Sequence, residues 1–312
     1  MLLNRRRLIQ SATVLWGGAA TSLGWAATPK ALTFLATGDW GMDGNYFQRQ
    51  VGHSMAAWAE HLDSRFVIAV GDNFYDAGVQ SVTDPHWKRS FEDIYSAKAL
   101  QTPWYAILGN HDYAGVPQAQ IDYAAVSKRW RMPARYYSQS MTTPDGSAVD
   151  IFFLDTTPML TGYRERKEDS LLRANARSQD VAAQLKWLKS ALAASKAPWK
   201  IVFGHHPVHS GGQHGDSREL VADVKPLLER YGVQAYICGH DHDLQHIDRG
   251  VTYICTGAGA NTRPVAGVQG TAFASDHAGF TTYRLTADRL AIDFVDNTGA
   301  VLHTAGIPRV RA

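Results

Sequence analysis

The chain has 312 residues, of which 45% are hydrophobic, 11% aromatic and 19% charged. This composition excludes general disorder, and two cysteines are too few for a disulfide scaffold. The formal net charge is +2, but residues 1–27 contribute Arg5, Arg6 and Arg7 and no acidic residue. The remainder has 28 basic and 29 acidic side chains, so 28 − 29 = −1. The mature chain therefore has no excess of positive charge that would attract nucleic acid or an anionic membrane surface. We expect neither as a partner.

Residues 1–27 combine a basic start, an apolar middle and a small-residue end, which is the layout of an export signal. Residues 4–9 also resemble a twin-arginine signal, with Asn4 in place of the usual Ser or Thr and Leu8 in place of Phe. We expect cleavage after Ala26 and a periplasmic or secreted mature protein. An uncleaved membrane anchor is the alternative, but the stretch is short and rich in glycine. No later segment is apolar for long enough to span a membrane stably.

Five short apolar runs in the mature chain each lead to a glycine followed by a polar residue. Such runs are typical of strands buried on both faces, with the polar residue at the carboxyl end. The runs are residues 32–36 before Gly38-Asp39, 66–70 before Gly71-Asp72, 104–108 before Gly109-Asn110, 200–203 before Gly204-His205, and 235–238 before Gly239-His240.

The intervening segments show helical periodicity. We predict helices over residues 51–62, from Asp84-Pro85 to Tyr95, over 181–192, and over 217–231 with a bend or break at Pro226. Residues 280–285 and 290–295 alternate in polarity, as antiparallel strands do. Strand, helix and strand in this order predict an α/β fold in which two packed sheets, flanked by helices, form one catalytic domain of residues 28–312.

The stretch 156–178 is strongly charged and has no clear period. We expect an exposed loop with some local helix. A solvated connection is the simpler interpretation, and a flap that contacts substrate is the alternative.

Seven side chains follow the predicted strand ends: Asp39, Asp72, Tyr75, Asn110, His205, His240 and His242. Carboxylate, imidazole and amide oxygen are the donors that hard or borderline metal ions need. One carboxylate can bridge two ions about 3.5 to 4 Å apart. A single Gly-Asp or Gly-Asn is more often a turn, but five such elements in order favour a metal site.

These motifs resemble the five blocks of the metallophosphoesterases, in the form of the purple acid phosphatases. The matching segments are Asp39-Trp40-Gly41, Gly71-Asp72-Asn73-Phe74-Tyr75, Gly109-Asn110-His111-Asp112, Val202-Phe203-Gly204-His205 and Gly239-His240-Asp241-His242. Residues 31–300 are similar to the small tartrate-resistant acid phosphatases of mammals. The resemblance implies the calcineurin-like metallophosphoesterase fold, a two-sheet βαβ sandwich flanked by helices. Two departures stand out: His206 and His209 replace aromatic residues, and Cys255 replaces Ser.

The resemblance also implies a ligand set. Most metallophosphoesterases begin with Asp-x-His, where this chain has Gly41, and Tyr75 would supply the missing ligand as in the purple enzymes. Fe(III) would be held by Asp39, Asp72, Tyr75 and His242, and a divalent ion (Fe, Zn or Mn) by Asp72, Asn110, His205 and His240. About five positive charges less three anionic ligands leave about two, which favours phosphate binding.

Two histidines are candidates for contact with the substrate. His111 would contact the phosphate and protonate the leaving group, steadied by Asp112 or another carboxylate, and His214 resembles a second substrate-facing histidine. The roles of His206 and His209 stay open. We expect the remaining isolated histidines to be structural: His53, His61, His86, His277 and His303.

The sequence thus favours an exported acid phosphatase, acting as a monomer on small phosphate monoesters by attack of a metal-bound hydroxide. A phosphodiesterase or nucleotide hydrolase with the same centre is the nearest alternative. A non-catalytic phosphate-binding or redox protein is another, although no ligand or proton donor is missing. We expect Cys238 and Cys255 to be buried thiols on neighbouring strands, and a disulfide between them stays open.

Overall fold

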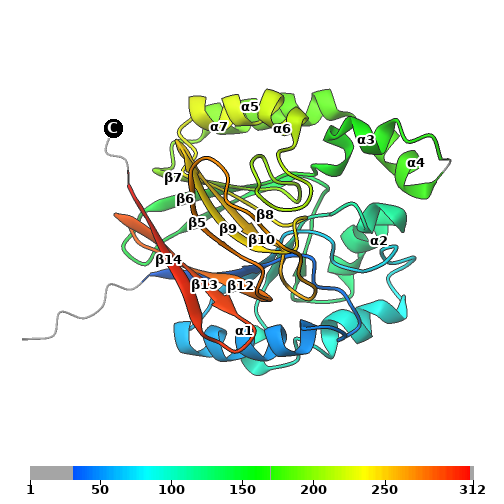
Figure 1. Cartoon of the computed structure of the whole chain (residues 1–312), viewed down its shortest axis with the longest axis horizontal. Helices are drawn as coiled ribbons and strands as arrows, with labels where there is room; N and C mark the ends of the chain where they lie inside the picture. The colour runs from blue at the N-terminus through cyan, green and yellow to red at the C-terminus, as the bar shows by residue number, and fades with distance from the viewer. Residues whose placement is uncertain (1–30, 169, 310–312) are drawn as a thin grey trace, which may run out of the picture.

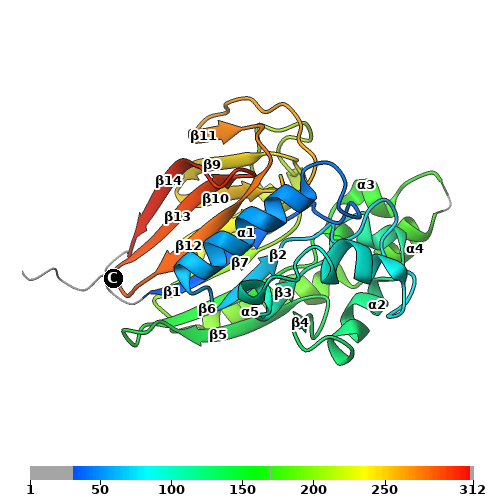
Figure 2. The same ribbon diagram turned by 90° about the horizontal axis from the view of Figure 1, so that it is seen from below.

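The computed structural model describes residues 31–168 and 170–309, so the predicted export signal lies outside the described residues. Two seven-stranded sheets face each other (Figures 1 and 2). The first has the order β14 (Val301–Pro308), β13 (Arg289–Asp296), β12 (Gly279–Leu285), β1 (Leu32–Thr37), β2 (Phe66–Ala69), β3 (Trp104–Ala106) and β4 (Trp130–Arg131). The second has the order β11 (Thr271–Ser275), β9 (Leu244–Arg249), β10 (Val251–Thr256), β8 (Ala235–Cys238), β7 (Trp199–Phe203), β6 (Ala148–Phe153) and β5 (Tyr137–Thr142).

Each sheet combines parallel and antiparallel strands: β12, β13 and β14 are antiparallel in the first sheet, and β5, β9 and β11 pair antiparallel in the second. Strands β1 to β4 run parallel in the first sheet, as do β6, β7, β8 and β10 in the second. The five strands predicted from the apolar runs are all present, and β12 and β13 pair antiparallel as predicted.

Helices cover the outer face of each sheet, which gives four layers (Figure 1). Helix α1 (Gln48–Leu62) covers the first sheet, and α5 (Val181–Ala194), α6 (Arg218–Asp223) and α7 (Lys225–Arg230) cover the second. The remaining short elements are α2 (Pro117–Asp122), α3 (Thr161–Arg164), α4 (Leu171–Arg177), the π-helix η1 (Trp87–Glu92), and the 3₁₀ turns η2 (Lys98–Leu100), η3 (Asp112–Ala114), η4 (Tyr123–Ala125) and η5 (Thr157–Met159).

Alternation along the central strands explains the layering. In β1, Phe34 and Ala36 point into the core between the sheets, whereas Leu35 packs in the cluster that contains Val51 and Met55 of α1. Successive side chains of such a strand point to opposite faces of the sheet, and both faces are buried. The sequence of the strand is therefore a continuous apolar run.

Most helix predictions are confirmed. The predicted break is present two residues before Pro226: Val224 separates α6 from α7, and Pro226 lies in the first turn of α7, where its missing backbone N–H is not needed. The helix predicted from Asp84 is present, and the Asp84 carboxylate accepts a hydrogen bond from the His86 backbone N–H at 2.9 Å. Its turns are π-helical and end at Glu92, before the predicted end at Tyr95.

The predicted loop 156–178 contains η5, α3 and α4 among its described residues, so the expectation of local helix is confirmed. Leu172 and Ala176 of this segment are buried in the same core cluster as Val51 and Met55 of α1. Within residues 31–168 and 170–309, no helix is both long and apolar enough to cross a bilayer.

Candidate metal centre

The predicted ligands gather where both sheets end together. Three of the five strands, β1, β2 and β3, belong to the first sheet, and β7 and β8 belong to the second. Hydrogen bonds join the loops of the two sheets at this edge. The His240 backbone N–H donates to Asp39 Oδ2 at 2.9 Å, and His205 Nδ1 lies 2.9 Å from the Val70 carbonyl oxygen. The site therefore contains residues from both sheets. The sequence pattern of any one strand does not predict that the two sheets meet here.

Three of the seven predicted ligands have left-handed backbone conformations. The φ angles are 57° at Asp39, 48° at Asp72 and 69° at His240. A non-glycine residue in a sparsely populated region costs on the order of 1–3 kcal/mol and persists only where its surroundings impose it. The sharp turns after β1, β2 and β8 direct these side chains toward one another.

Tyr75 lies at the centre of one half of the site. Its hydroxyl is 3.0 Å from Asp39 Oδ1, 3.0 Å from Asp72 Oδ2 and 3.1 Å from His242 Nε2. All four side chains are buried. The structure thus brings together the four residues that the resemblance assigned to Fe(III).

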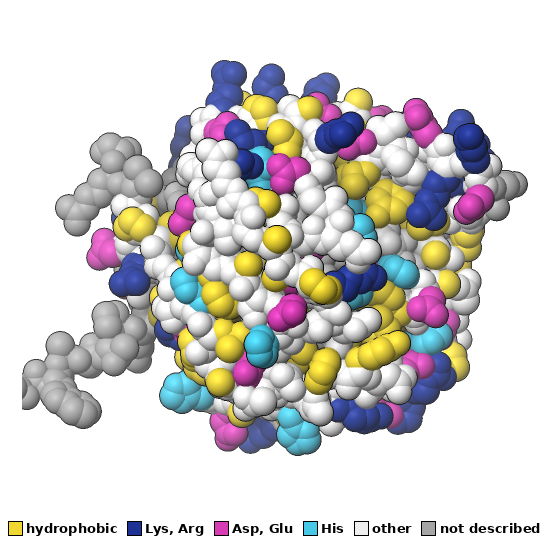
Figure 3. Space-filling view, in the orientation of Figure 1, with side chains coloured by type: hydrophobic (Ala, Val, Ile, Leu, Met, Phe, Trp, Pro, Cys, Tyr) yellow, Lys and Arg dark blue, Asp and Glu magenta, His cyan; other side chains and the backbone are white. Residues whose placement is uncertain are grey.

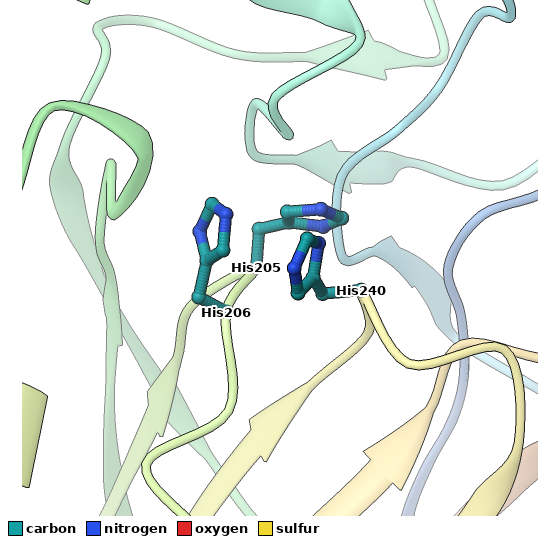
Figure 4. Close-up of side chains that lie close together, drawn as sticks. All are labelled: His205, His206 and His240. Atoms are coloured by element: carbon teal, nitrogen blue, oxygen red, sulfur yellow. The ribbon is translucent and has the colours of Figure 1, made fainter. Parts of the chain in front are cut away.

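The other half contains Asn110, His205 and His240 around the second side of Asp72. His205 Nε2 lies 3.2 Å from Asn110 Oδ1 and 3.4 Å from Asp72 Oδ2. The ring centroids of His205 and His240 are 5.2 Å apart (Figure 4). Because the Val70 carbonyl can only accept, His205 Nδ1 carries a proton, and it is Nε2 whose lone pair faces the site in the neutral form of the ring.

The charges and protons of this cluster fit a cation. One phenolic proton of Tyr75 cannot satisfy two carboxylates at once. Burial and the two neighbouring carboxylates hold the pKa of Tyr75 well above its ordinary value. Burial lowers the pKa of His205, but Asp72 and Asp39 outweigh burial and raise it to about 9. The metal-free site therefore gathers protons, and bound cations would replace them.

Gly41 leaves no room for a side chain. A Cβ atom at this position would lie 1.8 Å from the Asn73 carbonyl oxygen. A histidine therefore cannot occupy this place without displacing the backbone that precedes Tyr75. Tyr75 therefore occupies this corner of the site.

His111 borders the site but is not oriented by Asp112. Its Nδ1 donates to the Asp76 backbone carbonyl at 2.6 Å, and its ring centroid lies 4.3 Å from that of Tyr75. The expectation that Asp112 or another carboxylate steadies this ring is wrong, because a backbone carbonyl does so. The Asp112 carboxylate instead accepts backbone N–H groups, including that of Gly109 at 2.8 Å, and so fixes the loops after β2 and β3.

His214 is held by a carboxylate that the sequence argument did not assign. Its Nδ1 lies 2.7 Å from Asp241 Oδ1, and its ring centroid lies 4.1 Å from that of His240. Burial raises the pKa of Asp241, but hydrogen bonds from His214 and Ser210 prevail and lower it. Asp241 lies inside the fifth motif, between His240 and His242, which is the signal that could have identified it.

The structure separates the two histidines whose roles were open. His206 is buried at the site, 4.3 Å from His240 between ring centroids (Figure 4), and its Nε2 lies 3.2 Å from the Tyr163 hydroxyl. His209 instead contacts Asp216, with Nδ1 2.8 Å from a carboxylate oxygen. Tyr163 was missed because its segment has no periodicity.

The remaining cysteine and histidine predictions concern structural positions. Cys238 and Cys255 are free, buried and directly paired in register between β8 and β10, as expected of thiols on neighbouring strands. The histidines expected to be structural lie elsewhere in the described part of the chain: His53 is exposed, and the other four contact groups that are not predicted ligands, namely His61 with Trp58, His86 with Asp84, His277 with Ser275 and His303 with His246.

The fold and this site define a metal-dependent phosphoesterase, and residues 32–244 match the Calcineurin-like phosphoesterase family. The match covers more than half of the chain, which therefore belongs to this family. The predicted fold class is confirmed.

Curated relatives narrow the family further. The chain is 37% identical over 290 residues to purple acid phosphatase 17 of Arabidopsis thaliana, covering 89% of this chain and 85% of that protein. It is 36% identical over 310 residues to human tartrate-resistant acid phosphatase type 5, covering 92% and 94%. The chain belongs to the purple acid phosphatases; it is an acid phosphatase of a family with a dinuclear metal centre.

Solved structures agree on the fold. The structure described as GAP50, the anchor in the inner membrane complex of Plasmodium, has a TM-score of 0.79 and 26% identity, covering 90% of this chain and 89% of that one. The purple acid phosphatase PPD1 from yellow lupin has a TM-score of 0.64 and 17% identity, covering 90% and 54%. This second likeness shows the fold alone.

Proposed function

We propose that the chain hydrolyses small phosphate monoesters at an Fe(III)–M(II) pair, M being Fe, Zn or Mn. Asp39, Asp72, Tyr75 and His242 would hold the ferric ion, and Asp72, Asn110, His205 and His240 the divalent ion. The observation that carries the proposal is the Tyr75 hydroxyl within 3.1 Å of two buried carboxylates and an imidazole. A phenolate is a hard anionic donor suited to Fe(III). When bound, the ions would polarise phosphoryl oxygens and supply hydroxide as the nucleophile at acid pH.

The chain's own residues would position the substrate and move one proton. His111 donates Nδ1–H to a backbone carbonyl, so its imidazolium form would carry the second proton on Nε2 and donate it to the leaving oxygen. His214 is held in the same way by Asp241, and its imidazolium form would donate Nε2–H to a phosphoryl oxygen. General acid catalysis of this kind contributes about 10²- to 10⁴-fold in rate.

The test combines spectroscopy with turnover on purified, metal-loaded protein. We expect a visible charge-transfer band, about one iron per chain if M is Zn or Mn and about two if M is Fe, and faster hydrolysis of an aryl phosphate monoester than of its diester. Colourless, iron-free protein at full activity would overturn the metal assignment. A preference for the diester would favour the phosphodiesterase alternative, and a trapped phosphoprotein intermediate would contradict direct attack by hydroxide.

We also propose that residues 1–27 direct export and that residues 28–312 form the catalytic domain, acting as a monomer. Support comes from Arg5, Arg6 and Arg7 before an apolar stretch without acidic residues. Cell fractionation should find the protein outside the cytoplasm, with a mature N-terminus near Ala27. Substitution of Arg5 and Arg6 by Lys should retain it in the cytoplasm if the route is twin-arginine. Export unaffected by both substitutions would contradict that route.

A further inference from the structure

Tyr163 of α3 lies beside the candidate metal centre. Its hydroxyl is 3.2 Å from His206 Nε2, and the two ring centroids are 5.2 Å apart. One ring nitrogen of His206 lies within 4.8 Å of ring nitrogens of His205 and His240, which are both proposed metal ligands (Figure 4). The phenol is therefore separated from the centre by one imidazole ring.

The chain around Tyr163 is held in place. The Thr161 backbone N–H donates to Glu219 Oε1 of α6 at 2.8 Å, and the Tyr163 N–H donates to the Leu160 carbonyl at 3.1 Å. The phenol ring is half-buried and packs against the core cluster that includes Val51. Basic and acidic side chains are mixed on the surface over α3 and α4 (Figures 1 and 3). This segment therefore offers the site a placed hydroxyl rather than a field of one sign.

Both ring nitrogens of His206 have protein partners, and this sets the direction of its hydrogen bond to Tyr163. Nδ1 is 2.9 Å from Thr156 Oγ1, which also accepts the His206 backbone N–H at 3.0 Å. Thr156 is buried, and its hydroxyl has no third partner among the described residues. The single hydrogen of that hydroxyl is satisfied only if it is donated to Nδ1. In the neutral ring the proton is then on Nε2, and Nε2–H donates to the Tyr163 oxygen.

The Tyr163 hydroxyl therefore keeps its own hydrogen for another acceptor. A hydroxyl has one hydrogen and two lone pairs, and here one lone pair accepts from His206. An imidazolium form of His206 would also donate from Nε2, so the direction does not depend on the charge of the ring. In the described part of the chain the Tyr163 hydroxyl has no second hydrogen-bond partner. An ordinary phenol has a pKa of about 10, so the hydrogen is present at acid pH.

We propose that Tyr163 binds the substrate: its hydroxyl donates a hydrogen bond to a phosphoryl oxygen of a phosphate monoester held at the metal centre. His206 is the positioning residue, which occupies the phenol oxygen from behind and directs the hydrogen toward the substrate. This gives a role to a histidine that the sequence left open. The inference rests on the proposed function, because the substrate is the monoester of that proposal.

The bond should act mainly on binding. A phosphoryl oxygen is charged, and a hydrogen bond to a charged acceptor is roughly twice as strong as a neutral one. The oxygen is charged in the bound substrate as well as in the transition state, so the bond should lower KM more than it raises kcat.

The test measures phosphate affinity and turnover on metal-loaded proteins whose metal content is determined in parallel. Calorimetric titration with inorganic phosphate gives Kd, and hydrolysis of an aryl phosphate monoester gives KM and kcat. Tyr163→Phe keeps the ring, and we expect Kd and KM to rise about tenfold with kcat nearly unchanged. Tyr231→Phe is the matched control and should keep the wild-type constants. Tyr231 is also half-buried, and an arginine guanidinium lies over each of the two rings.

Two substitutions of His206 test its positioning role. His206→Phe removes the donor and should raise Kd and KM by no more than Tyr163→Phe does. His206→Gln retains an N–H group near the place of Nε2 and should restore most of the lost affinity. In the Tyr163→Phe background, His206→Phe should cause no further loss. Losses that add in the double variant would show that His206 acts independently of Tyr163.

The outcomes separate this inference from the proposed function. Wild-type protein that binds phosphate but hydrolyses no monoester contradicts the proposed function, and the Kd of Tyr163→Phe then decides the role of the hydroxyl. Wild-type protein that binds no phosphate contradicts both. Unchanged Kd and KM in Tyr163→Phe overturn the inference alone, as does an equal loss in Tyr231→Phe. Loss of metal in proportion to the lost affinity also overturns it, since the hydroxyl would then only support the centre.

Discussion

Replacement of Tyr75 by Phe removes one oxygen atom from the centre of the proposed ferric site and leaves the ring in place. The lost hydroxyl has contacts of 3.0 Å to Asp39 and Asp72 and of 3.1 Å to His242. If Tyr75 is a ligand, iron affinity should fall by more than the 10- to 100-fold typical of losing a group that only orients a ligand. The visible band should disappear, because no phenolate remains at the metal.

The same substitution has a second consequence in metal-free protein. Burial and the two carboxylates raise the pKa of Tyr75, so the phenol stays protonated and donates to one carboxylate. A hydrogen bond to a charged group contributes about 1.5–3 kcal/mol. Losing it should lower the free energy of unfolding by about 2 kcal/mol, or the Tm by about 4 °C for a chain of this size.

The assay measures iron content, the visible spectrum, and thermal unfolding with and without chelator. Tyr253→Phe is the matched control, since its buried hydroxyl has no hydrogen-bond partner among the described residues. It should retain iron and colour and lose no stability. A coloured Tyr75→Phe protein with a full complement of iron would refute the ligand assignment.

Three further changes test other parts of the structure. His111→Ala should reduce kcat about 100-fold with unchanged metal content. His53 is exposed, so His53→Ala should have no effect on kcat. Equal turnover by both variants would show that His111 has no role in the mechanism. Gly41→Ala should lower the free energy of unfolding by about 3 kcal/mol, because its Cβ would lie 1.8 Å from the Asn73 carbonyl oxygen. A denaturant titration measures this change, and an unfolding midpoint equal to that of the wild type would show that the clash is absent. Burial raises the pKa of Asp155 from 3.8 to about 7, so its contribution to stability is complete below about pH 4 and is lost as the pH rises through 7. Asp155→Asn should flatten this part of the profile in thermal melts at several pH values, and an unchanged slope would show that other groups cause it.

The sequence by itself indicated four helical segments, the candidate ligands and seven strands, which are β1, β2, β3, β7, β8, β12 and β13, but none of the other seven strands. Strands buried on both faces must be apolar throughout, so their ends are marked by the first glycine and polar residue, as at Gly38-Asp39 and Gly239-His240. Helix signals such as Pro226 are equally local. Each of these features depends on neighbours in the chain, and periodicity therefore reveals them.

Tertiary structure decided which partners hold the functional side chains. The Val70 carbonyl sets the tautomer of His205, the Asp76 carbonyl orients His111, and Tyr163 reaches His206 from a segment without periodicity. Each contact joins residues at least 35 positions apart, and two of the acceptors are backbone oxygens that every residue type possesses. The sequence could name the groups that meet at this site, but only tertiary packing, within each sheet's loops and between the two sheets, fixed their hydrogen bonds.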